Sequence, residues 1–429
     1  MINLKDKSGV PEVARDMRHM CETIGRRLAG SRGEEQAADY CVGRFGELGL
    51  ASIGKIPFAC KAWEPGHAEL TAITAAGSRA IAAQQVTHSP AAPAGGVEGD
   101  LVFFEPVDWE KGLRRDSLAG KIGLFLGGYG ESAEVFEQLH NSDLEALVFV
   151  DTRMQTDWPI ANGVGERFMT LIRKPMAYVS LMDAWALARD KVPRVRLTCS
   201  GTARDATSWN VAGELPGDPN GKIIVVCGHL DSVSVGVGAD DNASGMAAIL
   251  ECARRLKDKN RHHTLRFIGF GAEEQLSVGS HRYVKTQVKD LDNIAFVCNF
   301  DSIGAHLGLS TVMCTGTPDM DAYVESIVDK RKQYGVIVSD ACPYQDQFWF
   351  TANGIPGLWI TRQTHQPGYW YHHSEHNNLD AIAFEQIAWA AETACEMLGD
   401  LASRAEWPFE RAIAPELAAK VEGYIEELF

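Results

Sequence analysis

Residues 223–231, Ile-Ile-Val-Val-Cys-Gly-His-Leu-Asp, and residues 239–245, Ala-Asp-Asp-Asn-Ala-Ser-Gly, decide the fold of this chain. The run 223–227 is apolar and rich in β-branched residues, which predicts a buried strand. Residues 246–250, Met-Ala-Ala-Ile-Leu, predict the start of a helix. A histidine and several carboxylates therefore gather where a strand ends, the usual place for a ligand site in an open α/β sheet.

The same alternation of strand and helix extends through the second half of the chain. Because strands that alternate with helices form mostly parallel sheets covered on both faces, we expect a three-layer α/β fold with a mostly parallel, mixed sheet. Strands are predicted at 223–227, 264–270, 294–300, 311–315 and 357–360, and helices at 242–256, 319–332 and 384–401.

The chain divides into three parts by its sequence pattern. Residues 1–57 carry two amphipathic helices, with apolar side chains at steps of three and four, that we assign to the catalytic domain. Over 58–207 this periodicity fades, and short strand-like runs and few chemically active residues predict a separate β-rich insert. Residues 208–429 form the remainder of the catalytic domain.

Charge and cysteine usage limit the partners and the compartment. With 41 basic and 57 acidic side chains, the net charge of −16 argues against nucleic acid or an anionic membrane as a partner. The N-terminus has no apolar leader, and no apolar run approaches the length of a membrane span, so a cytoplasmic protein is expected. Ten scattered cysteines without a CxxC pair indicate reduced thiols. Homo-oligomerisation is left open.

Candidate ligands follow the predicted strands. Any one of them could be a helix cap or a solvated loop residue, but carboxylates that end neighbouring parallel strands converge on one sheet edge. So many buried charges are costly unless cations neutralise them. Histidine and carboxylate donors suit zinc, and two zinc ions need one bridging carboxylate. The candidates are His229, Asp231, Asp240, Asp241, Glu273, Glu274, Asp301 and His373.

Four of these residues can be given roles from their spacing. Asp231, two residues after His229, is placed to accept the second imidazole N–H and to fix the orientation of the ligand. Adjacent glutamates cannot both point at one metal without distortion. One of the pair at 273–274 should therefore bind metal while the other serves as a general base. Asp240 stands between the histidine and the following helix and is the expected bridge.

The motifs carry a family resemblance. Gly-His-Leu-Asp-Ser at 228–232, Gly-Ala-Asp-Asp-Asn-Ala-Ser-Gly at 238–245, Gly-Ala-Glu-Glu at 271–274, Asn-Phe-Asp at 299–301 and Tyr-His-His-Ser at 371–374 occur in that order. Together they resemble the co-catalytic di-zinc exopeptidases, which include bacterial leucyl aminopeptidases, aminopeptidase Y and glutamate carboxypeptidase. The resemblance is strong over 206–405, and the insert resembles the protease-associated domain of some members.

The resemblance implies a zinc-dependent aminopeptidase with two zinc ions per chain, a phosphorylase/hydrolase-like sheet and peptide substrates. It implies that Asp240 bridges the zinc ions, that Glu273 is the general base, and that the Asp240–Asp241 peptide bond is cis. The remaining assignments are His229 and Asp301 on one zinc, Glu274 and His373 on the other, and Asp231 as the partner of His229.

The chain departs from the family pattern in two places. The last motif usually ends on an aspartate, whereas here His373 is followed four residues later by Asn377, which also leaves His372 as a competing ligand. The second departure is Gln347, where the family often has a histidine that lines the substrate side. Neither change removes a ligand of the implied set.

Other functions are weighed against the aminopeptidase. A carboxypeptidase or dipeptidase of the same superfamily would need a basic pocket, which the sequence does not locate. An inactive binding protein and a single-zinc, glutaminyl-cyclase-like transferase are both disfavoured by the complete ligand set. Trp370 and Tyr371 adjoin the ligand loop and are the best candidates for walls of a substrate pocket. The insert is expected to serve as a lid or a dimerisation surface.

Overall fold

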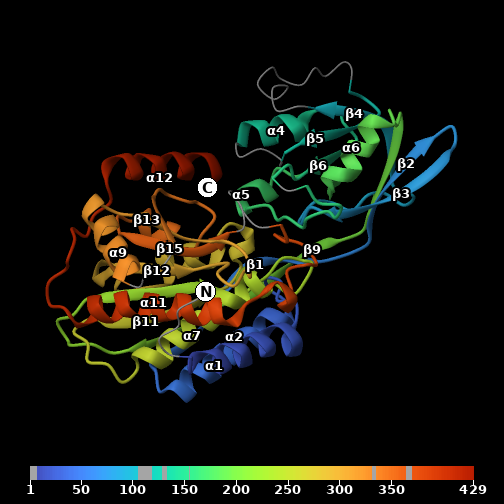
Figure 1. The fold of residues 1–429 in the computed structure, drawn as a ribbon. Helices are drawn as coiled ribbons and strands as arrows, with labels where there is room; N and C mark the ends of the chain where they lie inside the picture. The colour runs from blue at the N-terminus through green and yellow to red at the C-terminus, as the bar shows by residue number, and fades with distance from the viewer. Residues whose placement is uncertain (1–6, 105–117, 128–132, 154, 331–334, 364–369) are drawn as a thin grey trace. The chain divides into compact units, whose positions relative to one another are not determined.

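The structure is a computed structural model that describes residues 7–429, except 105–117, 128–132, 154, 331–334 and 364–369 (Figure 1). The chain forms two compact units. The first comprises Met1–Lys61, Ala206–Tyr371 and Glu375–Tyr424, and the second comprises Ala62–Asp205, His372–Ser374 and Ile425–Phe429.

An eight-stranded mixed sheet forms the centre of the first unit. Its order is β1-β9-β11-β10-β12-β15-β13-β14. Parallel pairs join β10 to β11 and β12, β12 to β15, and β13 to β14, whereas β9–β11 and β13–β15 are antiparallel. The strands are β1 (Ala51–Glu64), β9 (Thr202–Leu215), β10 (Ile223–His229), β11 (Thr264–Phe270), β12 (Ile294–Phe300), β13 (Leu309–Thr315), β14 (Gly335–Ser339) and β15 (Gly357–Gln363). The predicted mixed α/β class is confirmed.

The register of the central strands brings their carboxyl ends to one edge. His229 at the end of β10 pairs with Phe270 at the end of β11. Phe300 at the end of β12 pairs with Ile360 of β15. Residues that directly follow these strands therefore meet at this edge, where a ligand site is expected in such a sheet.

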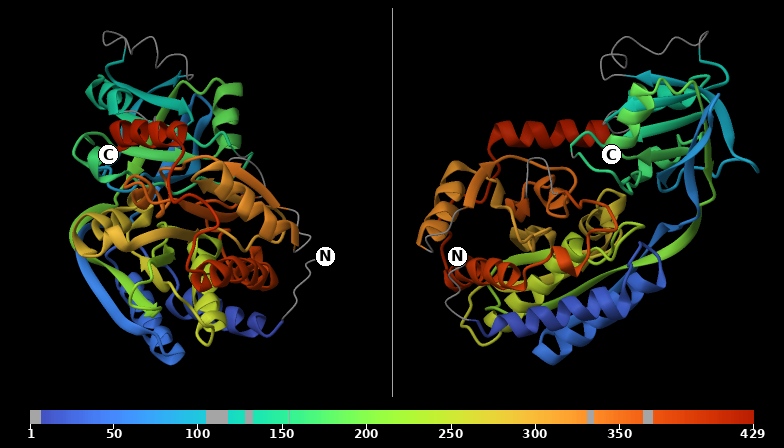
Figure 2. Two further views of the ribbon diagram at one scale, coloured as in Figure 1. Left: turned by 90° about the vertical axis from the view of Figure 1, so that its left-hand side faces the viewer. Right: turned by 45° about the vertical axis from the view of Figure 1, so that its right-hand side comes forward.

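Helices bury one face of this sheet. α7 (Gly245–Leu256) packs on β10 and β12, and α11 (Phe384–Ser403) packs on α7. The N-terminal helices α1 (Gly9–Arg18) and α2 (Arg32–Leu48) lie beside α7 in both figures (Figures 1 and 2). The apolar stripes expected of these two helices are confirmed, because Val13, Met17 and Phe45 are fully buried in the same core as Phe296 and Leu398.

Further helices complete the first unit. They are η1 (His19–Ile24), η3 (Ala239–Ser244), η4 (Glu273–Gln275), α8 (Val278–Arg282), η5 (Tyr283–Gln287), η6 (Leu291–Asn293), α9 (Pro318–Lys330), α10 (Phe348–Thr351), η7 (Leu379–Ala381) and most of α12 (Pro415–Leu428). Among the described helices, none combines the length and the apolar composition needed to cross a membrane. All ten cysteines are free thiols.

The second unit is built on a closed barrel of order β2-β3-β7-β6-β5-β4-β8. The sequence predicted a β-rich insert but not the closure, which leaves no open edge among these strands. The strands are β2 (Ala68–Thr74), β3 (Gly77–Gln85), β4 (Val97–Phe104), β5 (Lys121–Leu126), β6 (Ala146–Val150), β7 (Met176–Val179) and β8 (Arg194–Cys199). The helices are α4 (Ala133–Asn141), α5 (Glu166–Met169) and α6 (Leu181–Arg189).

Ser31 caps α2, since its hydroxyl accepts a hydrogen bond from the backbone N–H of Glu34 at 3.3 Å. Replacing Ser31 by Ala should lower the free energy of unfolding by ~1 kcal/mol, because this N–H loses its partner. Urea unfolding followed by circular dichroism measures the change. Ser31→Thr retains a hydroxyl cap and should stay close to the parent; an equal loss in both variants would contradict the capping role.

Candidate metal centre

A cluster of acidic side chains surrounds one imidazole at the carboxyl edge of the sheet. His229 ends β10, Asp301 follows β12, and Glu273 and Glu274 lie in the turn after β11. Asp241 comes from η3, at the end of the loop that follows β10. His229, Asp241, Glu273 and Asp301 are all at least nine-tenths buried. The convergence of strand ends expected from the sequence is present in the first unit.

The distances suit a metal ion. His229 Nε2 lies 3.1 Å from Asp241 Oδ1, 3.7 Å from Asp301 Oδ2 and 3.8 Å from Glu273 Oε2. One ligand atom each from His229, Asp241 and Glu274 can be chosen so that all three lie within 4.8 Å of one another. An imidazole nitrogen with carboxylate oxygens at this spacing is the donor set that zinc accepts.

The structure places Asp241, and not Asp240, beside His229. The Asp240 carboxylate is engaged elsewhere: Oδ1 accepts from the backbone N–H of Gly304 at 2.6 Å, and Oδ2 accepts from the Tyr371 hydroxyl at 2.8 Å. Asp241 instead reaches His229. Asp240 as the bridging ligand stays a prediction, and the geometry makes Asp241 the alternative to be tested. The sequence was ambiguous here, because the Asp-Asp/Asn pattern fits 240–241 and 241–242 equally well.

The cis peptide bond was predicted one residue too early. It joins Asp241 to Asn242, not Asp240 to Asp241. The Asn242 side chain is anchored on both sides, since Nδ2 donates to the carbonyl of Phe300 at 2.8 Å and Oδ1 accepts from the N–H of Gly245 at 2.9 Å. These bonds tie the peptide to the end of β12 and to the start of α7.

Asp231 contacts the turn at Glu273 and Glu274 as well as His229. His229 Nδ1 lies 3.2 Å from the Asp231 carbonyl oxygen and 3.5 Å from its Oδ1. The carboxylate also accepts hydrogen bonds from the backbone N–H groups of Glu273 at 3.0 Å and Glu274 at 3.2 Å. Asp231 thus contacts both the candidate histidine ligand and the turn that carries the glutamates, which suits an orienting residue.

Glu34 supports the same turn and was missed from the sequence. Its Oε1 accepts from the backbone N–H of Ala272 at 3.1 Å and from the hydroxyl of Ser208 at 2.7 Å. Three consecutive amides, at 272–274, therefore donate to two buried carboxylates. A glutamate in the first turn of a helix is usually explained as part of a cap, so its position in α2 gave no sign of this contact.

Burial and mutual repulsion shift the protonation of the cluster. Burial raises the pKa of Glu273 well above its usual range, and the charges of Asp346 and Asp301 raise it further, against the opposing effect of His229. Burial alone would lower the pKa of His229, but Glu273, Asp231, Asp241 and Asp301 hold it well above its usual value. A divalent cation would relieve the repulsion that causes these shifts.

His373 is described with the second unit. Its Nδ1 lies 2.6 Å from Asn162 Oδ1, and its carbonyl accepts from the N–H of Ala161 at 2.8 Å. Its ring stacks on His372 with centroids 3.7 Å apart. The assignment of His373 as a ligand, with His372 as its competitor, stays a prediction.

Asn377 and Gln347, the two residues that depart from the family pattern, are both buried. Asn377 Oδ1 accepts from the backbone N–H of Asp240 at 2.7 Å, so the amide supplies an acceptor where an aspartate is usual. Gln347 is buried beside Asp346, whose pKa burial raises to about 7. The amide oxygen of Asn377 therefore accepts the hydrogen bond that the backbone of Asp240 donates.

The aromatic candidates have different positions. Trp370 is 45% exposed, whereas Tyr371 is buried on Asp240. Trp359 is buried and donates from Nε1 to the carbonyl of Asp301 at 3.2 Å, and Trp349 stacks on His281. Tyr371 and Trp359 therefore hold the residues around the cluster in place, and Trp370 remains the candidate for a pocket wall.

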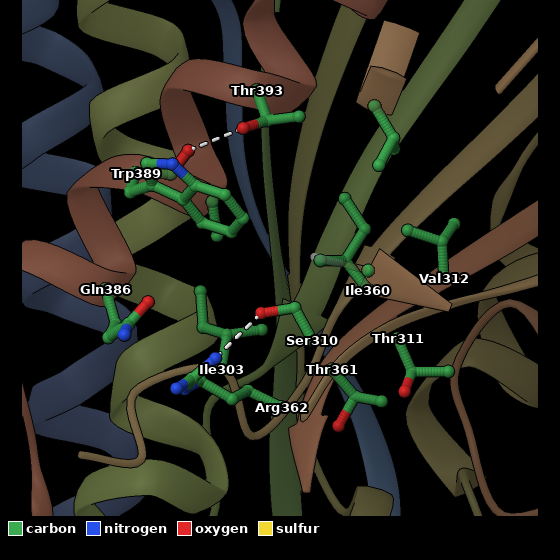
Figure 3. Close-up of a pocket in the computed structure, with 13 residues that line it drawn as sticks. Ile303, Ser310, Thr311, Val312, Ile360, Thr361, Arg362, Gln386, Trp389 and Thr393 are labelled. Carbon is green, nitrogen blue, oxygen red and sulfur yellow. Dashed lines mark hydrogen bonds between the residues drawn. The ribbon is translucent and has the colours of Figure 1, made fainter. Parts of the chain in front are cut away.

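A small cavity lies elsewhere in the first unit, between β13, β15 and α11 (Figure 3). Its volume is about 40 Å³, and apolar side chains such as Ile303, Ile360 and Trp389 make up much of its lining. Arg362 borders it and donates to the Ser310 hydroxyl at 2.9 Å. A space of this size holds a water molecule or two and no peptide.

Comparison with known proteins relates the segment that carries the acidic cluster to a peptidase family. Residues 210–398 match the model of Peptidase family M28, and this segment contains His229, Asp241, Glu273, Glu274 and Asp301. This match confirms the predicted resemblance to the zinc exopeptidases.

Relatives match this chain over most of its length. It is 25% identical to aminopeptidase YwaD of Bacillus subtilis (strain 168), over 95% of this chain and 88% of that protein. It is 23% identical to human carboxypeptidase Q, over 87% of this chain and 81% of that protein. The structure of BSAP, a zinc aminopeptidase from Bacillus subtilis, has a TM-score of 0.73 at 20% identity and covers 95% of this chain and 98% of its own. The likeness to the BSAP structure shows a shared fold.

The choice between Asp241 and Asp240 as the ligand can be tested by a matched pair of variants. Asp241→Asn should weaken zinc binding by more than the about 10–100-fold loss typical of residues that only orient ligands. Asp240→Asn should keep zinc bound but lower the free energy of unfolding by about 1–3 kcal/mol, because one of its two buried donors loses an acceptor. Zinc content after dialysis and urea unfolding measure the two effects. The reverse pattern would support Asp240 as the ligand.

Proposed function

We propose that this protein is a zinc-dependent exopeptidase that acts as an aminopeptidase and hydrolyses the N-terminal residue of peptides. The observation that carries the proposal is the ring of carboxylates around the His229 imidazole at the carboxyl edge of the sheet. Zinc and exopeptidase chemistry agree with the family. An acidic site is also suited to attract the α-ammonium group of a peptide.

The zinc ligands we propose are His229, Asp241, Glu274 and Asp301. The number of ions we propose is two per chain, with Asp241 as the bridging carboxylate and His373 as a further ligand of the second ion. Zinc, when bound, supplies a Lewis acid that polarises the scissile carbonyl. Asp231 orients His229 through its contacts with Nδ1.

Glu273 is the general base in this proposal. Its Oε1 accepts from the Ser277 hydroxyl at 3.3 Å, and its Oε2 faces His229 at 3.8 Å. One oxygen is thus held by the protein while the other faces the cluster. From this position the carboxylate can accept a proton from water and pass it to the leaving amine.

Glu273→Gln should retain zinc but lower kcat on aminoacyl anilides by about a hundredfold to ten-thousandfold, the usual contribution of a general base. Zinc analysis and steady-state kinetics on the same preparation measure both quantities. Glu274→Gln is the control, because it should lose zinc as well as activity. Turnover at the parent rate in Glu273→Gln would exclude this residue as the base.

Substrate end groups separate the aminopeptidase from a carboxypeptidase, which the likeness to carboxypeptidase Q supports as the second candidate. An aminopeptidase should cleave a free dipeptide and should lose most of its activity when the α-amine is acetylated, because the ammonium charge is removed. Hydrolysis of both forms is followed by chromatography of the released amino acids. Equal cleavage of the acetylated peptide, combined with loss of cleavage on amidation of the carboxyl end, would favour the carboxypeptidase.

We further propose that residues 58–207 form an insert of the protease-associated kind and that 1–57 and 208–429 together form the catalytic domain. For the catalytic domain we propose three layers, with helices on both sheet faces. Peptides are the proposed partners, with homo-oligomerisation open, and the cytoplasm is the proposed compartment.

A further inference from the structure

Arg27 is a fully buried arginine that no function so far explains. It lies between η1 and α2, and its guanidinium group donates to backbone carbonyls of another part of the chain. Nε donates to Leu230 at 2.8 Å, Nη1 to Val237 at 2.6 Å, and Nη2 to Gly238 at 2.9 Å. A fourth bond, from Nη1 to Gly25 at 3.1 Å, stays within its own segment.

These bonds join the two ends of the loop that separates His229 from Asp241. Leu230 directly follows the histidine, and Gly238 comes three residues before the aspartate. The backbones are also connected, since the N–H of Arg27 donates to the Ser232 hydroxyl at 3.1 Å and the N–H of Ser232 donates to the Arg27 carbonyl at 3.2 Å. The Arg27 side chain therefore holds both ends of the loop between His229 and Asp241.

The turn at Gly238 packs tightly against this guanidinium. Gly238 has a φ of +55°, and a Cβ atom there would lie 3.1 Å from Arg27 Nη2 and 2.4 Å from the carbonyl oxygen of Asp241. A side chain at 238 would therefore clash with the backbone of Asp241 as well as with the guanidinium. The Arg27 guanidinium and the backbone of Asp241 thus border the same turn.

A buried arginine usually pairs with a carboxylate. Here the described hydrogen bonds of the guanidinium all go to carbonyl oxygens. Burial lowers the pKa of Arg27, while the nearby charges of Asp231 and Asp241 raise it. The guanidinium therefore places a positive charge near two acidic residues of the site while its donors fix the loop.

We propose that Arg27 is a positioning residue of the metal centre, which holds His229 and Asp241 at the separation that zinc binding requires. The proposal rests on the zinc site proposed above and extends it to the N-terminal segment. Lysine cannot replace the guanidinium, because a single ammonium group cannot reach three carbonyls in the planar arrangement that the fork provides.

The test compares Arg27→Lys with Arg44→Lys in the full chain. Arg44 is a second buried arginine of the N-terminal helices, but it contacts Asp16, Glu12 and Glu47 and not the loop. Zinc affinity of the apo proteins is measured by competition with a chromophoric chelator, and kcat and KM are measured over a series of zinc concentrations up to saturation. Arg27→Lys should bind zinc about 10–100-fold more weakly, with KM unchanged and kcat recovering as zinc is added. Arg44→Lys should bind zinc like the parent.

Zinc affinity of Arg27→Lys equal to that of the parent would overturn the proposal, as would an equal loss in Arg44→Lys. If Arg27→Lys does not fold, Ser232→Ala decides, because it removes the hydrogen bond between Arg27 and the loop without adding an atom: weaker zinc binding supports the proposal and unchanged binding overturns it. A parent protein that binds zinc but cleaves no peptide would refute the proposed function and leave this comparison valid.

Discussion

The repulsion among buried carboxylates around His229 is the constraint on which the rest of the first unit depends. Asp241, Glu273 and Asp301 all approach one imidazole nitrogen within 4 Å, and none of the three is more than a tenth exposed. Charges so placed would separate or take up protons unless the backbone around them were fixed. The surrounding hydrogen bonds therefore serve to hold acidic groups where a cation can bind, at a cost that binding of the cation offsets.

Three separate contacts provide that rigidity. Asp231 and Glu34 hold the amides of the turn that carries Glu273 and Glu274, and Arg27 holds the loop that leads to Asp241. Two of these three residues come from the N-terminal segment, far from the candidate metal ligands in sequence. This segment is thus more than cover for the sheet, because Arg27 holds the loop before Asp241 and Glu34 holds the turn before Glu273.

Five strands of the sheet, β10, β11, β12, β13 and β15, could be predicted from the sequence, because apolar runs of strand length are clear when carboxylates and glycines end them. The candidate ligands at strand ends, such as His229 and Asp301, followed from the same pattern. The choice between Asp240 and Asp241 could not follow, since it depends on which carboxylate the Gly304 amide and the Tyr371 hydroxyl engage. The roles of Arg27 and Glu34 could not be predicted for a related reason: Arg27 donates to the carbonyl of Leu230, 203 residues away, and Glu34 accepts from the N–H of Ala272, 238 residues away.

The contacts of Asp240 also explain why the chain tolerates an asparagine at 377. The N–H of Asp240 needs one acceptor, and an amide oxygen provides it as well as a carboxylate would. An aspartate there would add another negative charge beside Asp240, whose pKa burial already raises to about 7. The neutral amide keeps the hydrogen bond without that repulsion. The departure from the family pattern thus preserves the geometry of the loop before Asp241 while reducing the charge around it.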